Sequence, residues 1–352
     1  MKKVKLTSVC RPKQWKTIPT SELRDVGYPV YGANGVIGYY DSYNHEQETV
    51  VITCRGATCG TVNLTHPRSY VTGNAMCLDN VDDSVDIKYL FYSMQAYDFS
   101  KVISGTAQPQ ITREGLEKVE FVLHSLDVQR EIVCILDKTD TLIEKRRLQL
   151  EKLEELVKSR FIELFGTSHD NKKGFAVVTI EEVCSLIKDG THQTPQYTEN
   201  KEEGYKFLSS KDVMSQKIDW TEIKYIPAEL HEKLYASVKP QRNDILMSKN
   251  GVNYGVAAVN DTDEVFDIYV SLALLRPKQM IDPVFFRCVI NNPETKRQFD
   301  SSIKGIGVPN LHLGEIKKTK IILPPMELQK EFVSFVAQVD KSKHFSELEV
   351  AA

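Results

Sequence analysis

The sequence has no long uncharged apolar stretch and almost no excess charge of either sign. No run of about 18 uncharged apolar residues occurs in the 352-residue chain, so we expect no transmembrane helix. The N-terminal residues 1–5 (MKKVK) are basic but precede no apolar segment, so we expect no signal peptide. The formal net charge of −3 argues against a protein that binds DNA through bulk positive charge alone. A nucleic-acid role would therefore depend on local patches.

Cysteine is scarce, and its pattern excludes a disulfide framework. The seven cysteines are odd in number and scattered, which indicates free thiols in a reducing cytoplasm. Cys54, Cys59 and His66 lie near one another in the sequence, but no second Cys/His pair completes a zinc ligand set. We therefore predict buried thiols and no metal site.

Motifs for catalysis are also missing. The sequence has no Asp/Asn-Pro-Pro-Tyr/Phe motif for amino methylation, and residues 323–326 (LPPM) are better interpreted as a turn from a strand into a helix. It has no Walker A motif and no nucleophile elbow. With 41% apolar residues, the chain is nevertheless a folded protein of two or three domains, without catalytic residues of its own.

An internal duplication dominates what is present. Residues 126–133 (LDVQREIV) resemble 326–333 (MELQKEFV) at an offset of 200, which also aligns Pro109 with Pro309. Residues 54–60 (CRGATCG) resemble 249–255 (KNGVNYG) at an offset of 195. Solenoid repeats are much shorter, roughly 20–50 residues, so the duplicated unit is a whole domain.

The duplication predicts an α+β fold with two similar mixed α/β globular parts and two long helices. The helices pair antiparallel as a coiled coil, with pseudo-twofold symmetry. The predicted boundaries are 1–124 for the first globular part, 125–166 for the first helix, 170–323 for the second globular part and 324–352 for a shorter second helix. The polar residues 166–174 form the linker.

Local patterns place further elements. Short apolar or alternating runs predict strands at residues 50–53, 61–64, 244–247, 256–259 and 320–323. Residues 86–95 and 282–291 begin with an acidic residue and predict helices.

The long helix is predicted over residues 126–164, which contain no Gly or Pro and repeat apolar residues every three or four positions. A single helix of this length cannot bury its apolar stripe alone, so the second helix is its expected partner. The predicted coiled-coil contacts are Ile132, Leu136, Leu142, Ile143, Leu150, Leu153, Leu156, Phe332, Val336 and Val339.

Several segments of both halves, in this order, resemble one family. They are residues 28–35 (YPVYGANG), 72–75 (TGNA), 109–112 (PQIT), 189–195 (DGTHQTP), 207–213 (FLSSKDV), 244–251 (DILMSKNG) and 271–277 (SLALLRP). Together with the duplication and the helices, they make the whole chain resemble the specificity subunit of type I restriction–modification enzymes.

The resemblance implies a non-catalytic subunit that binds double-stranded DNA and reads a split, asymmetric target, one half per target recognition domain. It implies two docked modification subunits, which are adenine-N6 methyltransferases, and two nuclease/translocase subunits that join through them. S-adenosylmethionine, ATP and Mg²⁺ would then belong to those partners, with no cofactor and no membrane contact for this chain. Two alternatives stay open, a fused restriction/methylation enzyme and a coiled-coil scaffold that binds only protein.

Candidate DNA contacts come from polar residues in the Gly- and Pro-bounded loops, because Arg or Lys can read guanine and Asn or Gln can read adenine. Residues 1–124 contain 13 basic and 13 acidic residues, so any basic face must arise by folding. The alternative is that these loops are ordinary turns with solvated side chains. The candidates are Tyr31, Asn34, Arg55, Thr58, Gln108, Gln110, His192, Lys249, Asn250, Asn253, Tyr254, Lys304, Asn310 and His312.

Overall fold

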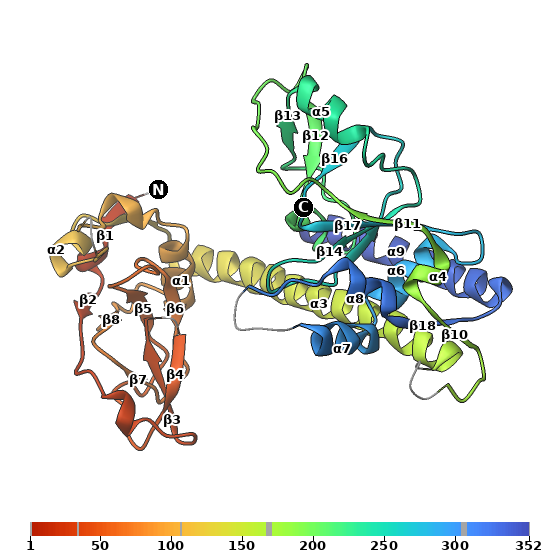
Figure 1. Cartoon of the computed structure of the whole chain (residues 1–352). Coiled ribbons are helices and arrows are strands. Elements are labelled where there is room, and N and C mark those ends of the chain that lie inside the picture. Colours follow the sequence, from red (N-terminus) through yellow and green to blue (C-terminus); the bar gives the residue numbers. More distant parts are fainter. Residues whose placement is uncertain (1, 34, 106–107, 167–170, 304–307, 352) are drawn as a thin grey trace. The chain divides into compact units, whose positions relative to one another are not determined.

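The computed structural model describes residues 2–33, 35–105, 108–166, 171–303 and 308–351, without the side chains of 344, 345 and 347–351. The chain forms two compact units, residues 1–145 and 146–352 (Figure 1). The described part contains no helix that is long and apolar enough to cross a membrane.

The first unit contains three small sheets, two short α-helices and the start of the long helix α3. The sheets have the strand orders β1-β9, β2-β8-β5-β6 and β4-β3-β7. The elements are β1 (Lys2–Lys5), β2 (Arg11–Lys13), β3 (Tyr28–Gly32), β4 (Gly35–Tyr40), β5 (Val50–Thr53), β6 (Val62–Leu64), β7 (Tyr70–Val71), β8 (Ala75–Asp79), α1 (Ile87–Gln95), α2 (Arg113–Leu116), β9 (Glu120–Leu123) and α3 (Leu126–Phe165).

The second unit repeats this plan. Its sheets have the orders β10-β18, β11-β17-β14-β15 and β13-β12-β16. The elements are β10 (Ala176–Thr179), α4 (Ile180–Val183), β11 (Cys184–Asp189), β12 (Tyr205–Leu208), β13 (Lys224–Ile226), α5 (Ala228–Tyr235), β14 (Ile245–Ser248), β15 (Ala257–Val259), β16 (Phe266–Ile268), β17 (Leu272–Pro277), α6 (Pro283–Ile290), α7 (Pro293–Ser302), α8 (Leu313–Lys318), β18 (Lys320–Leu323) and α9 (Met326–Ala351).

The two topologies confirm the duplication. Each unit has a two-stranded, a four-stranded and a three-stranded sheet, and the three-stranded sheet contains one parallel pair, β3 with β7 and β12 with β16. The predicted strands β5 and β18 have the expected bounds, and β6, β14 and β15 differ by a residue at one or both ends. The predicted helices α1 and α6 begin as expected, because Asp86 and Asp282 cap their N-termini with side-chain hydrogen bonds.

The long helix is confirmed, and each of its ends packs into a different core. Ile132 and Val133 pack into the core of the first unit. Phe161 and Phe165 lie in the core of the second unit, where their rings are 5.5 Å from that of Phe332. This division of the apolar residues between two cores could not be predicted, because both sets follow the same helical spacing.

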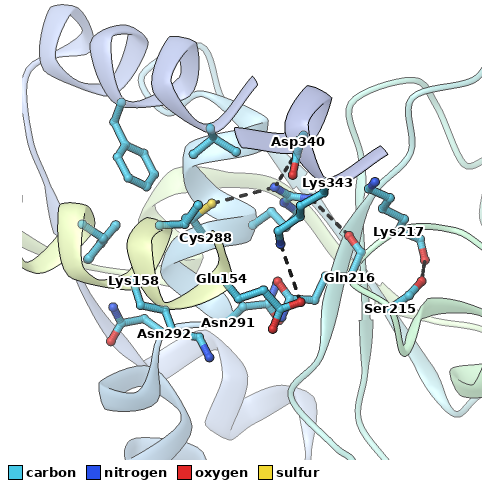
Figure 2. Close-up of a pocket in the computed structure, with 15 residues that line it drawn as sticks. Glu154, Lys158, Ser215, Gln216, Lys217, Cys288, Asn291, Asn292, Asp340 and Lys343 are labelled. Atoms are coloured by element: carbon cyan, nitrogen blue, oxygen red, sulfur yellow. Dashed lines mark hydrogen bonds and ion pairs between the residues drawn. The ribbon is translucent and has the colours of Figure 1, made fainter. Parts of the chain in front are cut away.

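The antiparallel pairing of α3 and α9 holds within the second unit. Arg160 of α3 lies 3.4 Å from Glu331, and Glu154 lies 3.6 Å from Lys343, so the residue numbers run in opposite directions along the two helices. Figure 2 shows the pocket where α3 and α9 meet α6, with Lys343 directed at Glu154.

The predicted coiled-coil contacts divide into two groups. Phe332, Val336 and Val339 are buried, and the first two pack against Phe161 and α6. The contacts predicted at Leu142 and Leu156 of α3 are corrected, because these side chains are 50% and 46% exposed. The buried apolar side chains of α3 lie near its two ends, at Val133, Phe161 and Phe165. The half-buried positions are Ile132, Leu136, Ile143, Leu150 and Leu153.

Candidate functional site

In the first unit, the loop after β5 is held against the segment before α2. The backbone N–H of Gly56 donates to the carbonyl of Pro109 at 3.1 Å, and that of Ile111 donates to the carbonyl of Cys54 at 3.0 Å. Between these bonds, Arg55 lies opposite Gln110 in an isolated antiparallel bridge. Gly56 has a φ of +88°, which a side chain would disfavour, so the turn requires glycine there.

The second unit builds the same junction from equivalent residues. The N–H of Gly251 donates to the carbonyl of Pro309 at 3.0 Å, and the N–H of Leu311 donates to the carbonyl of Lys249 at 2.8 Å. Asn250 lies opposite Asn310 in the matching bridge. The segments aligned by the offsets of 195 and 200 therefore contact each other in the same way in both units. We call this contact the loop junction of each unit.

The side chains at the two loop junctions differ in chemistry. Arg55 and Gln110 are both exposed. Asn250 and Asn310 are half-buried, and the side-chain oxygen of each is shielded from water without a hydrogen-bond donor among the described residues. A shielded acceptor without a donor costs about 1–3 kcal/mol.

A hollow beside the loop junction of the first unit is basic. Lys13, Arg55 and Arg113 line it together with Gln14 and Gln110, and no acidic residue is among its described lining. Lys13, Gln14 and Arg113 were not among the predicted contacts, although Arg113 directly follows the 109–112 motif. Lys13 and Gln14 come from the end of β2, and only the pairing of β2 with β8 brings them to this place.

Asp189 organises the corresponding region of the second unit. One of its carboxylate oxygens lies 3.0 Å from Lys249 Nζ and 3.2 Å from His192 Nε2. His192 is 73% exposed and free to meet a ligand, whereas the Lys249 side chain is only 5% exposed. The predicted role of Lys249 as a base contact is therefore corrected. Its side chain forms an internal ion pair with Asp189, which helps to hold the loop.

Two predicted tyrosine contacts are also corrected, because both lie in cores. Tyr31 is 5% exposed, and its hydroxyl accepts a hydrogen bond from the backbone of His66. Tyr254 is 8% exposed, and its hydroxyl donates to Asp300 at 2.6 Å. Lys296 Nζ lies 3.3 Å from the centroid of the Tyr254 ring, which further fixes it.

The remaining candidates lie on the loops as the sequence indicated. Gln108, Asn253 and His312 are exposed, and Thr58 is half-buried. Asn34 and Lys304 lie outside the described residues. Of the fourteen candidates, Arg55, Gln110, Asn250 and Asn310 are the ones that the fold brings into paired, equivalent positions.

The family model described as "Type I restriction modification DNA specificity domain" matches residues 1–154 and 172–349. The chain is 23% identical over 313 residues to the type I restriction enzyme MjaVIII specificity subunit of Methanocaldococcus jannaschii, covering 84% of this chain and 72% of that protein. It is 32% identical over 115 residues to the EcoprrI specificity subunit of Escherichia coli, a match that covers 33% of this chain and 28% of that protein.

A solved structure has the same fold. The S subunit of the type I restriction–modification system of M. genitalium matches with a TM-score of 0.62 and 17% identity, over 99% of this chain and 92% of that one. The family match covers most of both units, with residues 126–154 of α3 and most of α9. This chain belongs to the family of type I restriction–modification DNA specificity subunits.

Proposed function

We propose that this chain reads a bipartite DNA target, with one half-site read by each unit, and that it docks the methyltransferase subunits that modify the target. The observation that carries the proposal is the loop junction, which is built twice on the same backbone but carries different side chains. Two equivalent readers with different chemistry suit a target whose two halves differ.

The chemistry of the side chains supports base reading. An arginine suits the O6 and N7 acceptors of guanine, and a glutamine or asparagine suits the N6 and N7 atoms of adenine, in the major groove. Arg55 and Gln110 therefore favour a half-site with guanine next to adenine. Asn250 and Asn310 are half-buried, and their amide side chains favour adenines. Lys13 and Arg113 of the basic hollow are suited to phosphate contacts, which position the reader without selecting bases.

The long helix supports the docking of partner subunits. α3 exposes several large apolar side chains, which on a soluble surface commonly mark a protein contact. They are Ile135, Leu142, Leu148, Leu156 and Ile162, with exposed fractions of 46–64%. In this proposal the partners are adenine-N6 methyltransferase subunits with S-adenosylmethionine. The restriction subunits that bind them use ATP and Mg²⁺.

The test is selection of bound sites from a random DNA library by the chain in complex with its methyltransferase subunit. The expected result is a bipartite consensus, and exchange of residues 1–124 for those of a relative should change one half only. One contiguous site, or a change in both halves after the exchange, would contradict the proposal. DNA-independent assembly with no sequence preference would instead support the protein-only scaffold.

Single substitutions test the loop junctions. Arg55→Ala and Gln110→Ala should relax the consensus in one half-site, and Asn250→Ala and Asn310→Ala should relax it in the other. Loss of a good base contact is worth about 1–3 kcal/mol, or about 5- to 150-fold in discrimination. Lys118→Ala removes an exposed positive charge from the first unit outside the loop junction and serves as the control.

A further inference from the structure

Three side chains with different metal-binding groups meet in the first unit. His45 precedes β5, while Cys77 and Asp79 are two residues apart on β8 and therefore point to the same face of that strand. One possible ligand atom from each residue lies within 4.8 Å of the other two. The side chains of His45 and Asp79 are 9% and 13% exposed, and Cys77 is fully buried.

Hydrogen bonds determine which nitrogen of His45 carries a proton. Asn44 Nδ2 donates to the carbonyl of Val71 at 3.0 Å, and Asn44 Oδ1 accepts from the Val71 N–H at 2.8 Å, so the backbone fixes the orientation of the amide. The same Oδ1 lies 2.7 Å from His45 Nδ1, which must therefore be the donor. In a neutral ring, Nε2 then presents a lone pair to Asp79 Oδ1 at 3.0 Å. Two acceptors at this distance repel each other unless a proton on Nε2 or a metal ion lies between them.

The surroundings match the outer hydrogen bonds of a metal site. A metal-bound histidine usually donates its other ring N–H to a carbonyl or carboxylate oxygen, and a ligating carboxylate is usually hydrogen-bonded in turn. His45 has such a partner in Asn44, and the other oxygen of Asp79 accepts from Trp15 Nε1 at 3.0 Å. Both outer contacts are therefore in place.

A proton on Nε2 would also separate the two acceptors, but two features favour a metal ion. The first is the thiol of Cys77, which a simple His–Asp ion pair would not use. The second is the hollow that His45 and Asp79 line, which offers an entry path and attracts cations. No lysine or arginine is among its described lining, which includes the carboxylates of Glu46, Glu48, Asp79, Asp82 and Asp83.

The second unit has different side chains at the equivalent strand positions. The registers of β5 with β8 and of β14 with β17 make Leu274 equivalent to Cys77, and Arg276 equivalent to Asp79. Arg276 Nε lies 2.8 Å from a carboxylate oxygen of Asp244, so that unit supplies its own cation. The three-residue group is thus particular to the first unit.

We propose that His45 Nε2, Cys77 Sγ and Asp79 Oδ1 bind one Zn²⁺ ion, which fastens the loop before β5 to strand β8. Imidazole, thiolate and carboxylate are the ligands that zinc uses in proteins, and a water molecule from the hollow would complete the tetrahedral coordination that the three side chains begin. Metal–ligand distances of about 2.0–2.3 Å require the three side chains to draw together slightly. The ion would hold together two segments that are far apart in the sequence.

The test uses the full chain after treatment with a chelator. Titration with Zn²⁺ against a chromophoric competitor should show one tight site per chain, and Co²⁺ should give the charge-transfer band of a cobalt–thiolate bond. Cys77→Ser and Asp79→Asn should each lower the Zn²⁺ affinity by more than about 100-fold, because loss of an outer partner alone typically costs about 10–100-fold. Cys10→Ser is the matched control, since Cys10 is another buried thiol of the same unit.

Two results would overturn the zinc site. One is the absence of a saturable site in the unmodified chain, which needs no variant and leaves His45 and Asp79 as a protonated ion pair. The other is a cobalt–thiolate band that persists in Cys77→Ser but is lost in Cys10→Ser. Circular dichroism of each variant separates loss of metal binding from loss of folding.

Discussion

A buried glutamine fastens each long helix to its unit, and its removal gives a sharp test of the fold. Gln329 of α9 is fully buried. Its Oε1 accepts from the N–H of Asp282 at 2.8 Å, and its Nε2 donates to the carbonyls of Met280 and Pro324 at 3.2 and 2.8 Å. Gln129 of α3 is bound in the same way to the start of α1. The perturbation is Gln329→Met, which keeps the length of the side chain but removes the three hydrogen bonds.

The expected cost follows from the groups that would lose their partner. The carbonyl of Met280 belongs to an exposed residue and can turn to water, whereas Pro324 is buried and Asp282 is half-buried, so their backbone groups are more shielded. At about 1–3 kcal/mol for each shielded group, the substitution should destabilise the second unit by about 3 kcal/mol. For a unit of this size, that corresponds to a fall in melting temperature of about 6–12 °C.

Calorimetry measures the melting temperature, and hydrogen exchange of peptides that span residues 280–290 reports on the start of α6. Exchange there should accelerate, since the N–H of Asp282 loses its acceptor. Gln338→Met is the control, because Gln338 lies exposed on the same helix and its substitution should change stability by less than about 0.5 kcal/mol. If Gln329→Met melts like Gln338→Met, the hydrogen bonds of the buried glutamine do not stabilise the unit and the reasoning fails.

Three further predictions concern packing and charge. Phe165→Ala should cost about 3–5 kcal/mol in the second unit, measured by urea unfolding, because the ring is fully buried. Arg276→Met should cost about 3–5 kcal/mol by the same assay, because it leaves the buried carboxylate of Asp244 unpaired. The pKa of Asp137 is lowered from 3.8, chiefly by the hydrogen bond from Lys88, so this pair stabilises the first unit above that pH and the effect is lost as the pH falls through the lowered value. Asp137→Asn should remove that part of the acid unfolding profile, by less than about 1 kcal/mol because the pair is partly exposed. Each prediction fails if the variant unfolds like the unmodified chain.

Most of the fold could be predicted from the internal duplication of the sequence. Residues 54–60 and 249–255 align at one offset and Pro109 and Pro309 at another, and the structure shows these segments in contact in both units. Strand bounds such as those of β5 were predictable because apolar runs end at glycine and polar residues. The capping aspartates of α1 and α6 fixed the helix starts for the same local reason.

Burial of individual loop residues was not predictable. Tyr31 and Tyr254 stand next to glycines in segments that look like exposed loops, yet their rings pack into cores formed by distant strands. Lys249 looked like a base reader, but Asp189 from β11 pairs with it across the sheet. The group of His45, Cys77 and Asp79 was invisible for the same reason, since strand pairing and not sequence spacing brings its members together.

The division of α3 between two cores has a consequence for how such genes can be recombined. Because Phe161 and Phe165 complete the second unit, a fragment that starts at the linker would lack part of its own interior. A crossover within the linker would likewise pair the second unit with foreign core residues. A crossover near residues 140–150, where α3 belongs to neither core, would transfer each unit together with the helical residues that it needs. The middle of the helix is therefore the position at which a crossover can combine new pairs of half-site readers with both cores intact.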